Sequence, residues 1–386
     1  MIAYTDYAID ARVRREAETL TRHGFQVLCI TPRTGLPPTR SIQNGVQLRE
    51  LDTPKYRGKS TLAYVGSYLR FLHAASVACL RLLAGGKLDV VHVHNVPDFL
   101  VLAGLLPRLS GTKVILDIHD SMPETFAAKF SSRSIVSTAL RLEERLSALV
   151  ADRVICVNHP QRDALVRRGI PFPKTFVSMN VADPAIFTRR SAIDPARVDG
   201  ERFNLVYHGT MAKRLGVDLI VRAVAHLRPR IPGLRLHLWG RGDDLDELQR
   251  LTGELGVGDL VQFNPKGYAV PELPERLSGM ELGLVGNRRG AAADLMLPVK
   301  LLEYVALGIP AVVPRLKTIE HYFADDMVGY YEAENVTSMA AAIERLHRDP
   351  AARQRQSERA GQFLAEYGWE RQGPELVALY RQLLER

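Results

Sequence analysis

Short apolar runs alternate along the chain with segments in which apolar positions recur every three to four residues. This alternation predicts parallel α/β sheets, because each strand is followed by a helix that returns the chain. Met1–Tyr4 predicts a short first strand, and Asp10 can cap a helix from Ala11 to about His23. The pattern also predicts strands over 25–30, 88–93, 113–118 and 153–157, and helices over 60–84, 98–109 and 134–150.

The alternation is interrupted at residues 177–187, where Asn, Asp and Pro gather as in a linker. It restarts with strands over 203–207 and 234–238, and it ends with helices over 337–348 and 373–384. We predict an α/β fold of two Rossmann-like domains, residues 1–186 and 187–366, that face a cleft. Residues 367–386 are expected to form a helix that packs back on the first domain. Ligands of such sheets bind beyond the carboxyl ends of the strands.

Composition supports a globular protein of two domains, with 386 residues of which 46% are hydrophobic and 24% charged. No apolar run reaches the length of a membrane span, and no signal-peptide pattern opens the sequence. Cys29, Cys79 and Cys156 are scattered in apolar contexts, as reduced core residues of a cytoplasmic protein would be. The first strand is short, which suggests that a few residues precede it.

The positive charge lies in the first half. Residues 1–186 contain 24 Lys and Arg against 16 Asp and Glu, whereas residues 187–386 contain 27 of each. This imbalance predicts an anionic partner for the first half, such as the inner face of the cell membrane, a lipid phosphate or an acidic glycan. Nucleic acid is not expected, because the basic residues are dispersed and no binding motif is present. Residues 55–72 contain cations and aromatic residues together. This mixture indicates either a face that binds a bilayer or a solvated loop followed by a helix that faces the core.

The segment from Pro298 to Val313 carries the strongest functional pattern. Pro298 opens a helix whose first amides lack internal partners, and Lys300 and Glu303 share one face of it. Leu301 and Leu302 lie between them in the same turn. A cation, a carboxylate and free amides suit a phosphorylated, hydroxyl-rich ligand, of which a nucleotide-sugar is the obvious candidate. The alternative is an ordinary solvated Lys and Glu pair.

Glycine-rich turns follow several predicted strands of the second half. One turn contains Gly209, Thr210, Lys213 and Arg214, and a second contains Gly240. Glycine lets backbone amides approach a phosphate, and the two cations can neutralise it. The turn is neither a dinucleotide fingerprint nor a Walker loop, so an ordinary strand-to-helix turn remains an alternative.

Asn287, followed by two arginines, ends a further strand. Either arginine could reach a phosphate, although loop arginines are usually solvated.

Histidines of the first half lie beside carboxylates or amides at predicted strand ends. His94 and Asn95 follow one strand, and His119 and Asp120 follow another. We expect His119 to donate to a sugar hydroxyl or to polarise the reacting centre. The alternative is a buried structural histidine bonded to Asp117 or Asp120. A metal site is not expected, since helix amides and cations can hold a pyrophosphate without one.

These segments together resemble the GT-B glycosyltransferases of family 4, the glycosyl transferases group 1, which retain anomeric configuration. The resemblance covers nearly the whole chain, and the order of its motifs is more specific than any one of them. The motifs are Asp10-Ala-Arg12 with Glu16, His92-Val-His94-Asn95 with Asp98, Asp117-Ile-His119-Asp120 with Glu124, His208-Gly209-Thr210, and Pro298-x-Lys300-x-x-Glu303-Tyr.

The resemblance implies a role for each matching residue. It implies that Glu303 binds the ribose of a UDP- or GDP-linked sugar, that Lys300 lies near the donor, and that Arg214 and Lys213 hold phosphate. His119, Arg214 and Glu303 are the expected catalytic residues. The expected donor contacts are Gly209, Thr210, Lys213, Arg214, Gly240, Asn287, Pro298, Lys300, Leu301, Leu302 and Glu303, and the expected acceptor side is Asp10, Arg12, His94, Asn95 and Asp120.

The sequence departs from the family at two places of the donor site. Leu295 stands where the family has a second glutamate, next to Asp294, and Thr210 and Leu215 stand at positions that are usually basic. Arg214 is therefore the expected replacement.

We expect a retaining hexosyltransferase-type enzyme of polysaccharide biosynthesis that moves a sugar to a hydroxyl of a glycan, a lipid-linked acceptor or a small molecule. No cofactor and no metal are expected. The alternatives are a nucleotide-sugar epimerase or hydrolase of the same fold, or a non-catalytic protein that binds a sugar nucleotide or a glycan.

Overall fold

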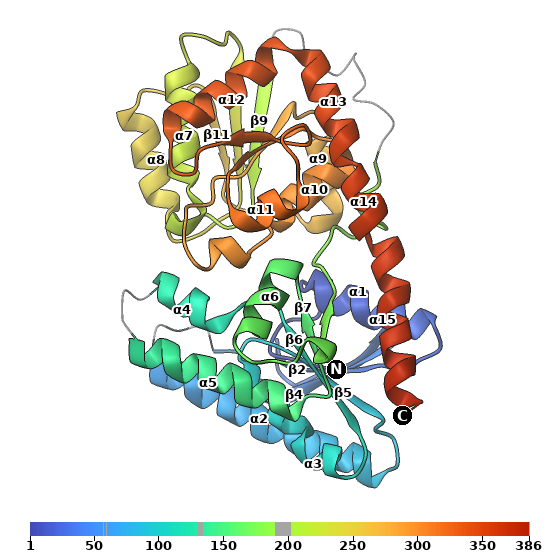
Figure 1. Ribbon diagram of the computed structural model, residues 1–386. Helices are drawn as coiled ribbons and strands as arrows, with labels where there is room; N and C mark the ends of the chain where they lie inside the picture. The colour runs from blue at the N-terminus through green and yellow to red at the C-terminus, as the bar shows by residue number, and fades with distance from the viewer. Residues whose placement is uncertain (57, 59, 130–133, 190–201, 386) are drawn as a thin grey trace. The chain divides into compact units, whose positions relative to one another are not determined.

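The computed structural model describes residues 1–56, 58, 60–129, 134–189 and 202–385. It divides the chain into two compact units (Figure 1). Unit 1 comprises Met1–Asn180 and Gln372–Arg386, and unit 2 comprises Val181–Arg371. The division falls at residue 180, within the segment 177–187 that the sequence indicates as a linker. Of residues 55–72, positions 57 and 59 lie outside the described residues.

Unit 1 is built on a sheet of eight strands within its described residues, in the order β3-β4-β2-β1-β5-β6-β7-β8. All neighbours are parallel except β3 and β4. The strand order reverses between β1 and β5, so the carboxyl ends of these two strands form a switch point. The strands are β1 (Ile2–Ala3), β2 (Leu28–Arg33), β3 (Arg40–Gln43), β4 (Val46–Pro54), β5 (Val90–His94), β6 (Lys113–Ile118), β7 (Arg153–Cys156) and β8 (Thr175–Val177).

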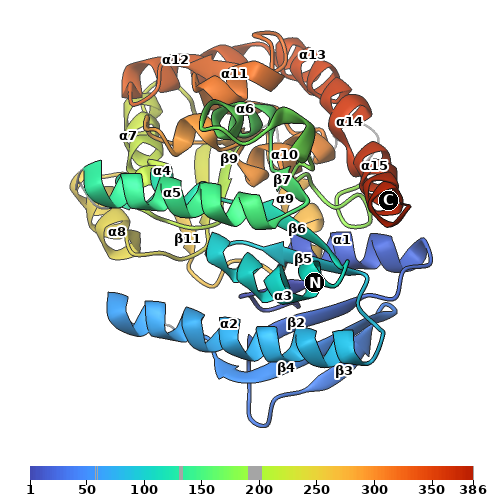
Figure 2. The same cartoon turned by 60° about the horizontal axis from the view of Figure 1, so that its bottom comes forward.

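The helices of unit 1 cover both faces of this sheet. α2, the 3₁₀ segment η1 with α3, and α5 lie side by side on one face (Figure 2). α15 contributes to unit 1 through residues far along the chain, because Tyr380 contacts His92 on β5. The bounds are α1 (Ala11–Arg22), α2 (Thr61–Ala84), η1 (Asp98–Gly104), α3 (Leu105–Leu109), α4 (Met122–Lys129), α5 (Ser134–Val150), α6 (His159–Arg167), η2 (Phe172–Lys174) and α15 (Trp369–Leu384).

Several features of unit 1 differ from the sequence prediction. The strand expected over 25–30 is observed at Leu28–Arg33. The helix expected over 98–109 is a 3₁₀ segment that continues as a short α-helix. The hairpin of β3 and β4 was not predicted, because β3 is exposed throughout and has no apolar alternation. Its turn is nevertheless visible in the sequence as Asn44-Gly45, where both residues have positive φ as a two-residue hairpin turn requires.

Unit 2 is built on a six-stranded parallel sheet within its described residues, in the order β11-β10-β9-β12-β13-β14. The strand order reverses between β9 and β12, which makes their carboxyl ends the switch point of this sheet. The strands are β9 (Phe203–His208), β10 (Leu234–Trp239), β11 (Val261–Asn264), β12 (Leu282–Leu284), β13 (Ala311–Pro314) and β14 (Gly329–Tyr331).

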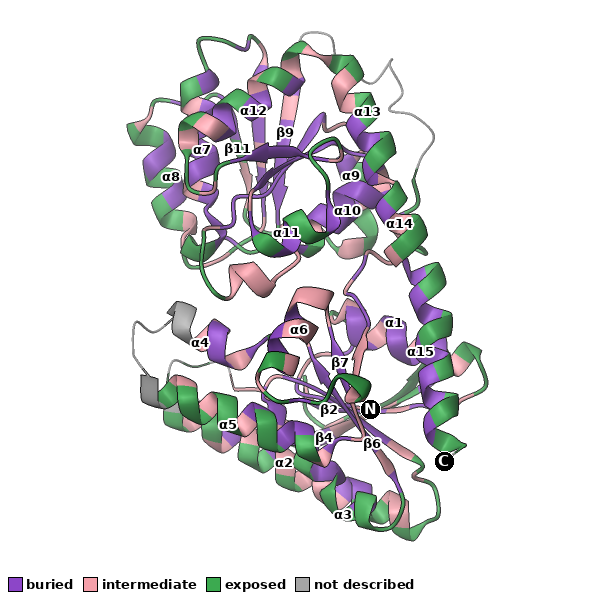
Figure 3. Ribbon diagram, in the orientation of Figure 1, coloured by how far each residue is buried: buried purple, intermediate pink, exposed green. Residues whose placement is uncertain are grey.

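The helices of unit 2 bury its apolar core against these strands (Figure 3). α7 packs beside α8 and α12, and α10 packs against β12 and β13. Gly283 on β12 is required there, because the ring of Tyr304 on α10 occupies the space that a Cβ would need. The bounds are η4 (Lys213–Leu215), α7 (Val217–Leu227), α8 (Leu245–Glu254), η5 (Val270–Glu272), α9 (Leu273–Leu277), η6 (Ala293–Leu295), α10 (Val299–Leu307), α11 (Lys317–Tyr322), α12 (Val336–Arg348), α13 (Pro350–Ala360) and α14 (Gln362–Tyr367).

Candidate functional site

The turns after β9 and β10 are held together by two glycines. Gly209 follows β9 with φ of 107°, and its amide donates to the carbonyl of Trp239 at 2.8 Å. Gly240 follows β10 with φ of 133°, and a Cβ there would collide with the carbonyl oxygen of Gly209. Side chains are excluded from this contact, so backbone groups form the surface at the carboxyl ends of the strands.

α10 places Lys300 against the same turn. Pro298 is the N-terminal cap residue of α10, and the amides of Val299 and Lys300 at its start precede the first helical hydrogen bond, which the Leu301 amide donates to the Pro298 carbonyl at 3.0 Å. The Nζ of Lys300 lies 4.7 Å from the centre of the Tyr207 ring, and its side chain passes beside Gly209. Burial lowers the pKa of Lys300 to about 8, although the neighbouring Glu303 opposes that shift. The ammonium group is therefore positioned by an aromatic face and a glycine turn.

Glu303 lies one turn further along α10, beside His208 at the end of β9. The Oε2 atom of Glu303 is 3.3 Å from the Nε2 atom of His208, but without the geometry of a hydrogen bond. Burial raises the pKa of Glu303 to about 7, although Lys300 opposes the shift. Burial and Lys300 lower the pKa of His208 to about 3, so this histidine is neutral. The structure thus brings Lys300, Glu303 and the glycine turns together at the switch point.

Lys213 and Arg214 follow the Gly209 turn, and Arg214 lies near Lys300. Both side chains are exposed, and no hydrogen bond or ion pair involves either side chain in the described part of the chain. The charge of Arg214 contributes to lowering the pKa of Lys300, which places the two cations near each other. Arg288, by contrast, is occupied by Asp218 at 2.6 Å and Glu334 at 3.2 Å.

The other expected donor contacts are described by their own hydrogen bonds and burial. The carbonyl oxygen of Thr210 accepts a hydrogen bond from the Tyr207 hydroxyl at 2.6 Å. Asn287 is buried, and its Oδ1 atom has no hydrogen-bond partner among the described residues. The side chains of Leu301 and Leu302 are buried in the core, and the Leu301 amide donates to the Pro298 carbonyl at 3.0 Å.

Asp294, beside the substituted Leu295, lies 3.8 Å from the Nζ of Lys317. This placement directs its carboxylate toward a surface lysine.

A buried charge network occupies the carboxyl ends of β5 and β6 in unit 1. Asp117 accepts two hydrogen bonds from the Arg12 guanidinium, at 2.9 and 2.8 Å. Its Oδ2 atom also lies 3.1 Å from His94 Nδ1 and 3.0 Å from His119 Nε2. Burial alone would raise the pKa of Asp117, but Arg12 and His119 outweigh burial and hold it well below its usual range. Asp117 is therefore ionised and surrounded by donors.

His119 lies at the edge of this network, and its side chain is partly exposed. Its Nε2 atom lies 3.0 Å from Nδ1 of His94 as well as from Asp117. Burial alone would lower the pKa of His119, but Asp117 outweighs burial and raises it. His119 is therefore bonded to Asp117, as the structural alternative expects. Because its side chain is partly exposed, His119 is also accessible to a ligand.

Asn95 and Asp120 continue the same strand edge. Asn95 Oδ1 accepts from the His119 amide at 2.8 Å, and its Nδ2 donates to Asp98 at 2.7 Å and to the Asp120 carbonyl at 2.8 Å. Asn95 therefore fixes the backbone that carries His119. The side chain of Asp120 is exposed.

Two expected acceptor residues have local structural roles. Asp10 caps α1 by accepting from the Val13 amide at 3.1 Å. Arg12 is only 2% exposed, and it also donates to the Ser178 carbonyl at 2.8 Å and lies 3.2 Å from Glu16. A guanidinium that is buried and fully occupied does not fit direct contact with an acceptor, so we correct the expected role of Arg12 and leave it out of the proposed acceptor side.

The same network contains residue types that bind metal ions. Potential ligand atoms of Glu16, His92, His94 and Asp117 lie within 4.8 Å of one another. However, Asp117 already accepts from Arg12 and lies beside two histidines, so a cation would have to displace these donors. These residues therefore fit a protein-internal network better than a metal centre.

Tyr380 was not predicted from the sequence as part of this region. Its hydroxyl lies 2.6 Å from His92 Nδ1, although the two residues are 288 positions apart. The sequence signal was limited to an aromatic position on an amphipathic helix, which does not indicate what that helix contacts. Only the fold brings α15 onto β5.

Comparison with known proteins follows the division into two units. Residues 8–180 match the glycosyl transferase 4-like domain, and residues 189–363 match the glycosyl transferases group 1 domain. The chain is 32% identical over 178 residues to a GDP-mannose-dependent alpha-(1-6)-phosphatidylinositol monomannoside mannosyltransferase of Mycolicibacterium smegmatis, covering 43% of this chain and 46% of that protein. It is 25% identical over 386 residues to D-inositol 3-phosphate glycosyltransferase 1 of Catenulispora acidiphila, covering 96% and 89%.

Solved structures show the same fold. Sucrose-phosphate synthase from Thermosynechococcus elongatus superimposes with a TM-score of 0.77 at 18% identity, covering 100% of this chain and 98% of that chain. HepE from Anabaena, solved in complex with UDP-glucose, gives a TM-score of 0.71 at 13% identity and covers 99% of both chains.

The two α/β units with parallel sheets therefore define a glycosyltransferase with the GT-B fold. More particularly, the chain is a glycosyltransferase of the family-4 kind, with a glycosyl transferase 4-like first half and a group 1 second half.

Proposed function

We propose that this enzyme transfers a sugar from a UDP- or GDP-linked donor to a hydroxyl of a glycan or lipid-linked acceptor, with retention of configuration and without a metal. The supporting observation is the arrangement of Lys300, Glu303 and the Gly209 and Gly240 turns at one switch point, with Arg214 nearby. Cations and helix amides stabilise the charge that develops on a departing diphosphate.

In this proposal each unit has its own task. Unit 2 binds the donor, with Glu303 accepting from ribose hydroxyls and with Lys300, Arg214 and Lys213 contacting phosphates. Unit 1 presents His119, held by Asp117 and His94, as a group that can donate to a hydroxyl. Family resemblance supports retention, and the curated relatives named above support a sugar transfer to an inositol-containing or lipid-linked acceptor.

The direct test is a thermal-shift panel of UDP-, GDP- and dTDP-sugars, because a ligand that binds only the folded state raises the unfolding midpoint. We expect nucleotide-sugars of one base to raise the unfolding midpoint more than those of the other bases do. Incubation of that donor without an acceptor separates transfer from the activity of an epimerase or hydrolase. If no nucleotide-sugar shifts the midpoint, the proposed donor site is wrong.

Glu303→Gln is expected to lower the affinity for the nucleotide-sugar that shifts the midpoint by about 10- to 100-fold. Hydrogen bonds to a charged group contribute about 1.5–3 kcal/mol each. Since the pKa of Glu303 is about 7, wild-type affinity should rise as pH increases through 7, when the carboxylate forms. The variant should lose this pH dependence. Titration calorimetry between about pH 6 and 8 measures both effects. Glu254→Gln on the exposed face of α8 is the control, and an unchanged affinity in Glu303→Gln would contradict the role.

A peripheral contact with an anionic membrane is part of the proposal. Among the described residues, no helix is long and apolar enough to cross a bilayer. Leucines of η1, α3 and α5 are nevertheless exposed, and the exposed Arg141 and Arg145 lie on α5. Figure 3 shows exposed positions along α3 and α5. Leucines with interspersed arginines suit the interface of an anionic bilayer. The leucines are Leu102, Leu105, Leu106, Leu109, Leu142, Leu146 and Leu149.

The double variant Leu142→Glu with Leu146→Glu is expected to reduce binding to vesicles of phosphatidylcholine and phosphatidylglycerol at least about tenfold, because burying one leucine contributes about 1.5–3 kcal/mol. Co-sedimentation of vesicles measures the bound fraction. Ile42→Glu on the exposed strand β3 replaces an exposed apolar side chain by one negative charge elsewhere and should bind as the wild type does. Equal binding of the double variant and the wild type would exclude this surface.

A further inference from the structure

Three polar groups at the switch point of unit 2 have no hydrogen-bond partner within the described residues. They are the Nε2 atom of His208, the carboxylate of Glu303 and the ammonium group of Lys300. After burial, the charge of Lys300 is the main influence on the pKa of His208 and of Glu303, so the three groups lie together. Buried polar groups are normally hydrogen-bonded, and three without partners in one place indicate that a ligand completes their contacts.

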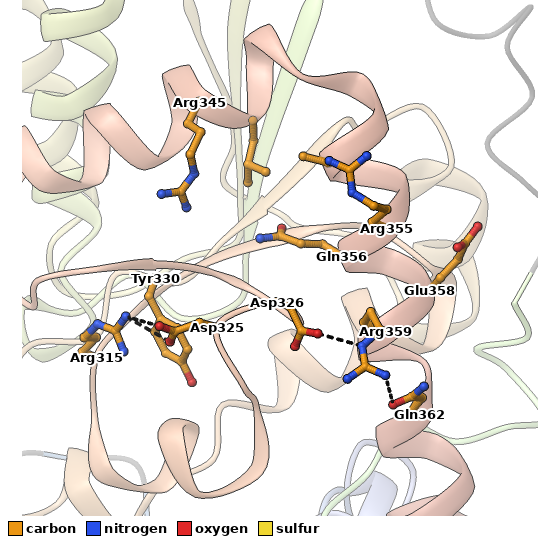
Figure 4. A pocket seen from close by; sticks show the side chains of 12 residues that line it. Arg315, Asp325, Asp326, Tyr330, Arg345, Arg355, Gln356, Glu358, Arg359 and Gln362 are labelled. Atoms are coloured by element: carbon orange, nitrogen blue, oxygen red, sulfur yellow. Dashed lines mark hydrogen bonds and ion pairs between the residues drawn. The ribbon is translucent and has the colours of Figure 1, made fainter.

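The polar pocket edged by α12, α13 and β14 shows the opposite arrangement. Arg315 lies 3.0 Å from Asp325, and Arg359 lies 2.8 Å from Asp326 (Figure 4). Carboxylates of the protein itself neutralise these two arginines, so neither needs a ligand. The groups at the switch point are therefore the stronger indication of binding.

His208 is the member of the switch-point group whose task is open. It ends β9 and is 6% exposed, and its ring meets the Tyr304 ring edge-on with 5.2 Å between the ring centres. Tyr304 is itself fixed, because its hydroxyl donates to the Val206 carbonyl at 3.3 Å. Burial and Lys300 lower the pKa of His208 to about 3, so the imidazole is neutral and offers one N–H group. His208 is therefore a fixed, uncharged donor.

The acceptor within reach of this donor is the carboxylate of Glu303. Its Oε2 atom lies 3.3 Å from His208 Nε2, and a small rotation of the carboxylate would align the two atoms for a hydrogen bond. An ionised carboxylate only accepts, so it selects the tautomer of His208 that carries the proton on Nε2. A histidine with a purely structural role would instead leave Nε2 buried without a partner, which is costly.

We propose that His208 is a positioning residue for Glu303: its Nε2–H group donates to Oε2 and holds the carboxylate in the orientation that accepts from the pentose hydroxyls of a nucleotide. This role rests on the proposed function, in which Glu303 binds the ribose of the donor. A glutamate side chain has several rotamers, so holding one oxygen reduces the entropy that is lost when the ligand binds. His208 thereby raises the affinity for the donor without touching it.

The test is a double-mutant cycle on the full chain, in which titration calorimetry measures the affinities for UDP and GDP. At about pH 7.5 Glu303 is mostly ionised and Lys300 mostly charged. His208→Met removes the donor and keeps an apolar side chain of similar length, so it should weaken the nucleotide that binds the wild type more tightly by about tenfold. In a Glu303→Ala background the same substitution should change the affinity by less than about twofold, because the partner of His208 is absent.

Two further variants separate this role from a structural one. His208→Gln restores an N–H group at a similar distance from the backbone, so its affinity should lie within about threefold of the wild type. His237→Met removes a half-buried histidine of the neighbouring strand β10, whose Nε2 atom lies 3.1 Å from Asn204, and it should bind as the wild type does. If His208→Met does not fold, the affinity of His208→Gln decides.

The outcomes distinguish the role of His208 from the donor site itself. An unchanged affinity of His208→Met, an equal loss in both backgrounds, or a loss of about tenfold in His208→Gln overturns the role of His208 and leaves the donor site intact. If the wild type binds neither UDP nor GDP, the proposed donor site is wrong, and the role of His208 is overturned with it.

Discussion

Lys300→Met is expected to lower the turnover number about 100- to 1,000-fold, which is the effect of removing one group that stabilises developing charge in a transition state. Lys300 is placed for this role by the Tyr207 ring, by the Gly209 turn and by the first turn of α10. Methionine keeps the length and apolar stem of the side chain, so the fold of α10 should persist. Initial rates of nucleoside diphosphate release, with the donor that the thermal-shift panel identifies, measure the loss.

The pH dependence of turnover provides a second readout of Lys300. Burial lowers the pKa of this lysine to about 8, so the ammonium is charged below that pH and is lost above it. Wild-type turnover should therefore fall as pH rises through 8, and Lys300→Met should lack this alkaline limb. Lys317→Met is the matched control, because Lys317 is a lysine of the same unit whose side chain is 80% exposed. If Lys300→Met and Lys317→Met behave alike, Lys300 does not contact the diphosphate.

Asp117→Ala is expected to destabilise unit 1 by about 3–5 kcal/mol, the usual cost of leaving a buried charge without its partner. The substitution removes both carboxylate oxygens that the buried Arg12 guanidinium contacts, and it also removes the neighbour of His94 and His119. Urea unfolding followed by circular dichroism measures the change in the free energy of unfolding.

The control for Asp117→Ala is Asp52→Ala, which removes an aspartate that pairs with Arg33 at 3.0 Å but is 72% exposed. Exposed pairs contribute at most about 1 kcal/mol, so this variant should unfold nearly as the wild type does. Adding Arg12→Met to Asp117→Ala should not recover the lost stability, because it leaves the buried carboxylate of Glu16 without its cation. A loss of stability no larger than that of Asp52→Ala would show that the network is not structural.

Much of the fold follows from local patterns in the sequence. The strand Lys113–Ile118 and the helix over 134–150 have the predicted bounds, because their apolar runs have clear limits. The hairpin at Asn44-Gly45 and the strand β14 were not predicted, since edge strands carry little apolar alternation. The order of strands within each sheet could not be predicted either, because it depends on contacts between residues that are distant in the chain.

Prediction of the candidate site was similarly divided. The sequence indicates the cluster of Pro298, Lys300 and Glu303, because one helical turn brings these residues together without any tertiary contact. It does not indicate that Arg12 is buried or that Tyr380 reaches His92, since both contacts join distant segments. The role of Arg12 was accordingly misjudged as contact with an acceptor.

By itself, the sequence of this protein determined the α/β class and the helix that carries Lys300 and Glu303, because hydrophobic period and glycine or proline positions act over a few residues. Only the tertiary structure decided which charges are buried against each other and which remain available. Burial and pairing depend on packing between distant elements, and these set the pKa values of Asp117, Lys300 and Glu303. The same packing buried the Oε1 atom of Gln356 without a hydrogen-bond partner among the described residues, which no sequence motif indicates.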